Sequence, residues 1–143
     1  MKTINPTQLV NTSRKWYLID AEGKNLWRIA TKVAVLLKWK SKVDFAPHLD
    51  NWDYVVVLNA WKVVVTWNKA EDKMYHTHSW FIGWIKEVNF NTLKEKKPTE
   101  ALKLAISGML PKNKLRDGML SRLKLELGST HKYEAQQPVT IEL

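Results

Sequence analysis

The sequence predicts an α/β domain built around a parallel β-sheet, and two observations lead to this class. The first is a pair of short β-branched runs, at residues 53–59 and 62–66, which show no polar alternation, as expected of strands covered on both faces. The second is that a strand pattern and then a helical pattern precede them, an order that favours a right-handed crossover between parallel strands. A third strand falls within residues 62–66, or its pairing is taken up by residues 73–77.

The first part of the chain supplies the elements of this crossover. Residues 1–14 are polar and lack periodicity, so we expect an N-terminal arm. Residues 16–20 have the composition of a compact strand ended by a turn. A helix should then run from about residue 26 to residue 38 behind an Asn25 cap, because apolar residues recur there at spacings of three and four.

The second half of the chain is predicted to be mainly helical. A short helix begins at Phe90, and Pro98 is well placed as the first residue of another. Asn113 can cap a further helix whose outer face is basic. Residues 123–127 are a candidate final strand, and residues 128–143 form a polar tail that we expect on the surface.

Composition narrows the function classes. The 143 residues fit one domain, and 23 Lys and Arg against 14 Asp and Glu give a formal net charge of +9 and a pI near 9.7. Such a balance favours a polyanionic partner, either nucleic acid or an anionic membrane. No signal-peptide core and no apolar run near the roughly 20 residues of a membrane span is present. We therefore expect a soluble, cytoplasmic protein, and the lack of cysteine suits a reducing compartment.

Sequence support for catalysis is weak. His76 and His78 could place two imidazoles on one strand face and hold a metal together with His48, but no carboxylate or thiolate with ligand spacing completes the set. Histidines that donate to phosphate or ribose are the preferred interpretation. A metal-dependent nuclease using Asp53 with the two strand histidines is the enzymatic alternative. No cofactor, metal or small-molecule substrate is predicted, because the phosphate-loop and nucleophile-elbow motifs are absent.

Two basic segments predict a nucleic-acid surface. The helix expected at residues 112–124 carries cations on either side of its apolar stripe, which makes it a candidate phosphate-binding element. The exit of the first helix, residues 38–42, adds a second group of lysines. Each could be only a solvated face, but together they form a spread-out positive footprint. Such a footprint suits RNA recognised by shape and backbone.

With these residues in view, the chain resembles the bacterial-type L-thirteen family of large-subunit ribosomal proteins. The resemblance runs from Trp16-Tyr17 to the Ala135-Gln136-Gln137-Pro138 motif. Its most specific segments are residues 53–68, Met74-Tyr75-His76-Thr77-His78-Ser79 and Gly108-Met109-Leu110-Pro111-Lys112.

This resemblance implies an α/β fold with a central, mainly parallel four-stranded sheet flanked by helices. It implies a non-catalytic protein of the cytoplasmic ribosome that binds large-subunit (23S) rRNA beside neighbouring ribosomal proteins, acts early in assembly and stabilises the folded rRNA. A free-standing RNA-binding regulator is the alternative. The RNA-binding residues carried over by position are Arg28, Lys38, Lys40, Lys42, His48, Lys69, His76, His78, Lys86, Lys112, Arg116, Arg122 and Lys124.

Tryptophan is the systematic departure from the family pattern. The chain has eight Trp and only five Gly, where average usage of about 7% predicts about ten Gly. Trp16 matches the family, whereas glycine fits the family pattern at Trp27, Trp39, Trp52, Trp61, Trp67, Trp80 and Trp84. Several of these are turn positions, where a bulky residue costs roughly 1–3 kcal/mol. We hypothesise that these seven are UGA codons decoded as glycine in the source organism. Tryptophans that stack on RNA bases, and deliberate engineering, are the alternatives.

Overall fold

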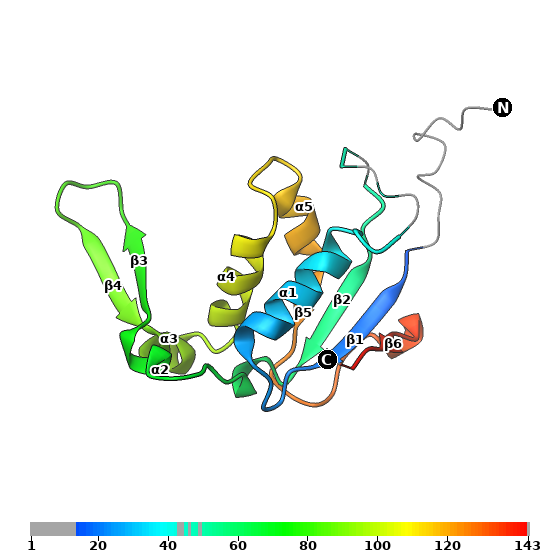
Figure 1. The fold of residues 1–143 in the computed structure, drawn as a ribbon, viewed down its shortest axis with the longest axis horizontal. Helices are drawn as coiled ribbons and strands as arrows, with labels where there is room; N and C mark the ends of the chain where they lie inside the picture. The colour runs from blue at the N-terminus through cyan, green and yellow to red at the C-terminus, as the bar shows by residue number, and fades with distance from the viewer. Residues whose placement is uncertain (1–13, 43–44, 46, 49, 143) are drawn as a thin grey trace.

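The computed structural model describes residues 14–42, 45, 47–48 and 50–142. Its centre is a four-stranded sheet of β1 (Trp16–Asp20), β2 (Tyr54–Leu58), β5 (Leu123–Leu125) and β6 (Val139–Thr140), in the order β5-β2-β1-β6 (Figure 1). Every neighbouring pair in this sheet is parallel. The predicted α/β class with a four-stranded parallel sheet is therefore confirmed.

The β1–α1–β2 unit agrees with the sequence pattern. α1 (Leu26–Leu37) begins after Asn25, whose side-chain oxygen accepts a hydrogen bond from the Trp27 backbone N–H at 3.1 Å, so the predicted cap is confirmed. β1 and β2 then pair in parallel register, with Trp16 opposite Tyr54. Three consecutive valines of β2, residues 55–57, are fully buried, as a strand covered on both faces requires.

Three helices of the second half complete the domain. α3 (Phe90–Lys96) begins where predicted, and its Asn89 cap accepts from Thr92 N–H at 3.0 Å. α4 (Glu100–Met109) packs against α1 (Figure 1). Its buried residues are Ala101, Leu102, Ala105 and Ile106. It begins two residues after Pro98. α5 (Arg116–Ser121) follows and contributes Met119 to the core.

An antiparallel hairpin extends from one end of the domain. β3 (Met74–His78) pairs with β4 (Ile85–Asn89) in a separate two-stranded sheet. The one-turn helix α2 (Lys69–Asp72) and α3 lie at its base, while its tip projects away from the central sheet (Figure 1). Most residues of both strands are exposed.

The structure corrects the predicted third strand. Residues 60–62 form a 3₁₀ helix instead, and Val64 makes only an isolated bridge to Asn25. The alternative at residues 73–77 is also wrong, since that segment pairs with β4 and not with the central sheet.

The C-terminal elements need one further correction. The basic helix predicted for residues 112–124 is reduced to the six residues of α5, with Leu115 and not Asn113 at its N-cap. The tail at 128–143 lies on the surface as expected, since none of its described residues is buried, and it also contributes β6, which pairs with β1. The predicted N-terminal arm, residues 1–14, lies outside the described residues except for Arg14.

Candidate nucleic-acid interface

The exposed side of α1 carries an open row of cations. The helix buries one stripe in the core, so Arg28, Thr31, Lys32, Val35 and Lys38 are left on the opposite side; we call these five residues the α1 face. Arg28 and Lys32 are one helical turn apart and both are exposed. Neither forms an ion pair within the described part of the chain. Their charges are therefore available to a partner.

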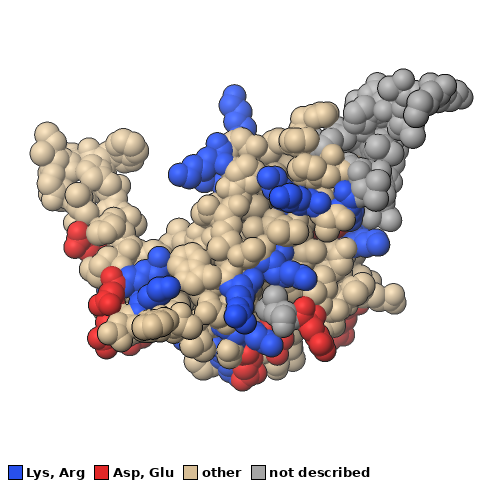
Figure 2. Space-filling view, in the orientation of Figure 1, with Lys and Arg blue, Asp and Glu red and all other residues tan. Residues whose placement is uncertain are grey.

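The surface is hollowed beside this row. All of the α1 face except Lys38 lines a hollow of about 540 Å³, together with Leu36, Ser41 and Ile141. A second hollow, of about 310 Å³, lies towards Lys40 and Met109. A third, of about 360 Å³, lies between Arg28 and the turn at residues 23–25. Figure 2 shows Lys and Arg gathered over the side of the molecule that carries α1, and Asp and Glu mainly along its lower edge.

Several predicted contact residues lie outside α1 with their charges exposed. Lys40, which follows the helix, and Lys112, in the α4–α5 loop, are exposed and form no ion pair among the described residues. His48 is exposed in the loop before β2. Lys69 is exposed at the start of α2, and Lys86 on β4.

Two other predicted contact residues are engaged inside the chain. The ammonium of Lys42 donates to Asp53 at 2.6 Å, and that carboxylate, 2% exposed, also accepts from the Lys15 backbone N–H at 2.9 Å. Arg122 makes a two-pronged contact with Asp50, with Nη2 to Oδ2 at 2.7 Å. Both pairs lie near the amino ends of the central strands, where they hold the loop before β2 to the sheet.

The contact between Arg122 and Asp50 shifts the pKa of both side chains. Hydrogen bonding from Arg122 holds the pKa of Asp50 below its ordinary value, with Arg14 adding a weaker effect. The same hydrogen bond raises the pKa of Arg122, although burial of the guanidinium opposes it. The guanidinium also lies over the Tyr54 ring, 5.8 Å from its centroid. The charge of Arg122 is therefore used within the fold, where Asp50 and the Tyr54 ring hold the guanidinium in place.

Two further members of the predicted set of contact residues are only partly exposed. Arg116 is half-buried in α5, and its Nε is buried with no hydrogen-bond partner in the part of the chain that the structure describes. Lys124 is half-buried on β5 and donates to the Ser121 carbonyl at 3.0 Å. The structure brings neither of them into the α1 face.

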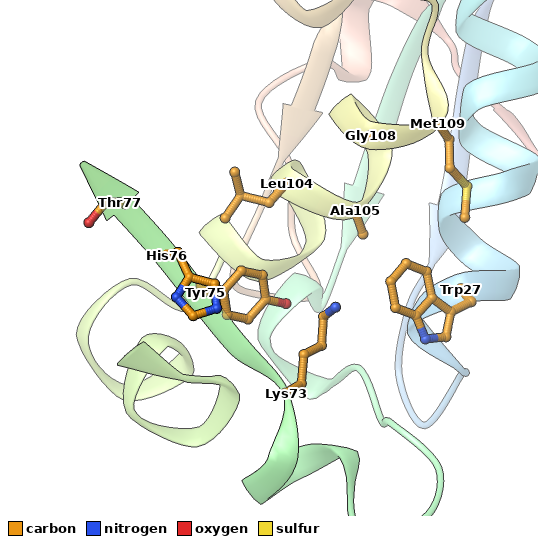
Figure 3. A pocket seen from close by; sticks show the side chains of 9 residues that line it. All are labelled: Trp27, Lys73, Tyr75, His76, Thr77, Leu104, Ala105, Gly108 and Met109. Carbon is orange, nitrogen blue, oxygen red and sulfur yellow. The ribbon is translucent and has the colours of Figure 1, made fainter. Parts of the chain in front are cut away.

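The hairpin carries the histidines and a separate hollow. His76 and His78 are exposed two residues apart on β3; His76 Nδ1 lies 3.2 Å from the Glu87 carboxylate on β4, and His78 Nδ1 accepts from the Trp80 backbone N–H at 2.8 Å. A hollow of about 420 Å³ lies between β3, α1 and α4. Figure 3 shows Lys73 pointing into it between Tyr75 and Trp27, with the ammonium 4.8 Å from the Trp27 ring. Burial raises the pKa of Tyr75 in this wall.

The geometry does not assemble a metal site. Among the described residues, no group of three or more His, Asp and Glu side chains is placed to hold a metal ion. Asp53 is buried and paired with Lys42 at the sheet, while the two strand histidines are exposed on the hairpin. In the same described portion, no helix is long and apolar enough to cross a membrane.

Sequence reasoning missed Lys32 and Lys73 as site residues. The signal for Lys32 was its position four residues after Arg28 on the polar side of a predicted helix. Lys73 had no local signal, because its hollow is formed by segments far apart in the chain.

A basic α/β domain with exposed cations beside surface hollows has the features expected of a polyanion-binding protein. Comparison with known families specifies this class. The model of the family described as Ribosomal protein L13 matches residues 14–132, and the chain belongs to this family. The family is structural and not enzymatic, and its members are components of the ribosome, which is cytoplasmic in bacteria.

Individual relatives match over nearly all of their length. A "Large ribosomal subunit protein uL13" from Treponema denticola is 53% identical over 130 residues, which cover 91% of this chain and 92% of the relative. The protein of the same name from Thioalkalivibrio sulfidiphilus is 47% identical over 143 residues and covers both chains completely. The one from Shewanella amazonensis is 49% identical over 131 residues, 92% of each chain.

Proposed function

We propose that this protein is a structural constituent of the large ribosomal subunit, that it binds 23S rRNA, and that it acts early in assembly to stabilise the folded rRNA. Neighbouring large-subunit proteins are its other partners. Membership of the family supports the ribosomal role. The observation that carries RNA binding is the α1 face, where Arg28 and Lys32 are exposed, unpaired in the described chain and adjacent to hollows.

This arrangement suits the backbone of folded RNA. Helical RNA is recognised mainly by shape and by contacts to phosphate and the 2′-hydroxyl, since its deep groove is closed to side chains. The two cations one turn apart can each contact a phosphate, while the hollows receive parts of the RNA that project from its backbone. The exposed members of the predicted set extend this contact, together with the half-buried Lys38: Lys40, His48, Lys69, His76, His78, Lys86 and Lys112.

The test of RNA binding is a double substitution in the α1 face. Arg28→Ala with Lys32→Ala removes two phosphate contacts, so the slope of log K against log salt for a 23S rRNA fragment should fall by about two. The matched control is Lys96→Ala with Lys103→Ala, which removes the same charge from exposed positions on α3 and α4. The control should bind with an unchanged slope. Equal losses in both variants would mean that net charge, and not the α1 face, binds the RNA.

The place of the protein in the subunit needs a separate measurement. A subunit constituent sediments with the large subunit through a salt wash, whereas a free-standing regulator is released into the supernatant. Pulse labelling followed by gradient fractionation tests the assembly role, since an early protein carries label in the smallest large-subunit precursors. Label found only in mature subunits would contradict early action.

A further inference from the structure

Three tryptophans adopt a backbone conformation that favours glycine. The φ angles of Trp39, Trp67 and Trp80 are 61°, 62° and 63°. Within the described residues, only two other non-glycine positions, Asn59 and Gln137, have positive φ. The left-handed region is open to glycine and tolerated by asparagine, but it is a genuine outlier for a bulky side chain.

Trp39 lies in a C-terminal helix cap that is built for glycine. Its backbone N–H donates to the Leu36 carbonyl at 3.0 Å, and the next N–H, of Lys40, donates to the Val35 carbonyl at 3.2 Å. With Lys38 as the cap residue of α1, these are the two hydrogen bonds of a Schellman motif. Trp39 occupies its left-handed position, where glycine is the usual residue.

Trp67 and Trp80 gain little packing in return for this conformation. Their side chains are 90% and 94% exposed. Trp67 lies in the turn before α2. Trp80 lies in the hairpin loop, where its backbone N–H donates to His78 Nδ1 and its exposed ring meets the edge of the His78 ring, with centroids 6.1 Å apart. Glycine at position 80 would make the backbone hydrogen bond equally well.

Base stacking does not explain the three together. Exposed rings at Trp67 and Trp80 could serve as stacking platforms. Trp39, however, is only 1% exposed, and its indole Nε1 is buried without a hydrogen-bond partner among the described residues. A ring inside the protein cannot stack on RNA. What the three positions share is their φ angle, not their surroundings.

We propose that seven tryptophans of this sequence, all except Trp16, are glycines in the protein made by its own cells, because UGA codons there are decoded as glycine. The three left-handed positions carry the proposal. Trp27, Trp52, Trp61 and Trp84 follow from the same decoding rule and not from their own φ angles, none of which is positive. The rule also restores ordinary composition, since the five glycines present and seven more give 12 in 143 residues, against an average near 7%.

The reassignment changes the binding surface. Trp27 forms one wall of the hollow between β3, α1 and α4, and its ring lies over the Lys73 ammonium (Figure 3). With glycine at position 27 the hollow is larger, and Lys73 retains only the Tyr75 ring, 5.2 Å away. Lys73 is then available to a phosphate. The exposed rings at Trp67 and Trp80 have no part in binding.

The decisive experiment is mass spectrometry of the protein purified from ribosomes of the organism that carries this gene. The intact mass should be lower than the written sequence by seven tryptophan-to-glycine differences. Peptides should show glycine at positions 39, 67 and 80, while the peptide that contains Trp16 should retain tryptophan as an internal control. Tryptophan at positions 39, 67 and 80 would overturn the proposal, whether or not the protein binds rRNA.

A recombinant comparison tests the physical basis without the source organism. Trp67→Gly with Trp80→Gly should raise Tm by about 4–8 °C, because both rings are exposed and both backbones are left-handed. Trp16→Gly is the control and should lower Tm, because Trp16 stacks on Tyr54 with centroids 4.3 Å apart. A fall in Tm for the double variant would count against glycine at these positions.

Discussion

Two groups of Lys and Arg side chains in this chain differ in what they face: one group is open to solvent, and the other contacts carboxylates of the same chain. Arg28, Lys32 and Lys40 are exposed and form no ion pair among the described residues. Lys42 and Arg122 instead contact carboxylates at the amino ends of the central strands. The outward group is available to RNA, whereas the inward group stabilises the domain that presents it.

The difference between the two groups depends on burial of one member of each ion pair, which is the Asp53 carboxylate in one pair and the Arg122 guanidinium in the other. A charge taken from water must be paired, because an unpaired buried charge is strongly destabilising. Asp53 is 2% exposed, so Lys42 is required opposite it. No buried carboxylate faces Arg28 or Lys32 in the described structure. Substitutions in the inward group should therefore affect folding, and those in the outward group should affect binding.

The largest effect is expected for Lys42→Ala. It leaves the buried Asp53 carboxylate with only the Lys15 backbone N–H, so the free energy of unfolding should fall by about 3 kcal/mol in urea titration. The double variant Lys42→Met with Asp53→Asn removes both charges and should regain part of the loss. Wild-type stability of Lys42→Ala would contradict the assignment of Lys42 to the fold.

Arg122→Ala should have the next largest effect on stability. Loss of two charge-assisted hydrogen bonds to Asp50 should lower the free energy of unfolding by about 1.5–3 kcal/mol, since half of the Asp50 side chain remains open to water. Arg122→Lys keeps the charge without the paired geometry and should recover only part of it. The salt slope of RNA binding, measured below the unfolding temperature, should not change. A lower salt slope for Arg122→Ala would instead indicate that Arg122 contacts the RNA.

The Asp50–Arg122 pair also predicts a pH dependence. Because the folded-state pKa of Asp50 lies below its unfolded value, its stabilisation is complete above the unfolded pKa and is lost as the pH falls through the folded pKa. Asp50→Asn should therefore flatten the acid limb of a stability–pH curve. The control Asp72→Asn, at an exposed position in α2, should leave that limb in place. An acid limb unchanged by Asp50→Asn would exclude this linkage.

The sequence predicted the parts of the fold that are encoded locally. β1, α1, β2 and α4 each carry their own apolar pattern, because one face or both faces are buried. The β3–β4 pairing was missed because both strands are largely exposed, so no polar alternation marks their register. β6 has only two residues, both exposed, and is defined by its position beside β1.

For the candidate site, the sequence predicted the positive charge but not the arrangement of the charged side chains. The sequence shows which residues are cations, but not which carboxylate each one faces. Asp50 and Arg122 are 72 positions apart, so their pairing leaves no local signal. Within residues 38–42, Lys40 and Lys42 have identical chemistry, and only the fold brings one of them to Asp53.

The smallest effect on stability is expected for Lys40→Ala, two residues from the largest. Lys40 is exposed and unpaired among the described residues, so its removal should change the free energy of unfolding by no more than about 0.5 kcal/mol. It lines the hollow beside Lys38 and Thr31, so the salt slope of RNA binding should fall by about one. Lys42→Ala should show the reverse, with lower stability and an unchanged slope at a temperature where the variant is folded. If Lys40→Ala and Lys42→Ala lowered the slope equally, pairing with a buried carboxylate would not distinguish a lysine that stabilises the fold from one that binds RNA.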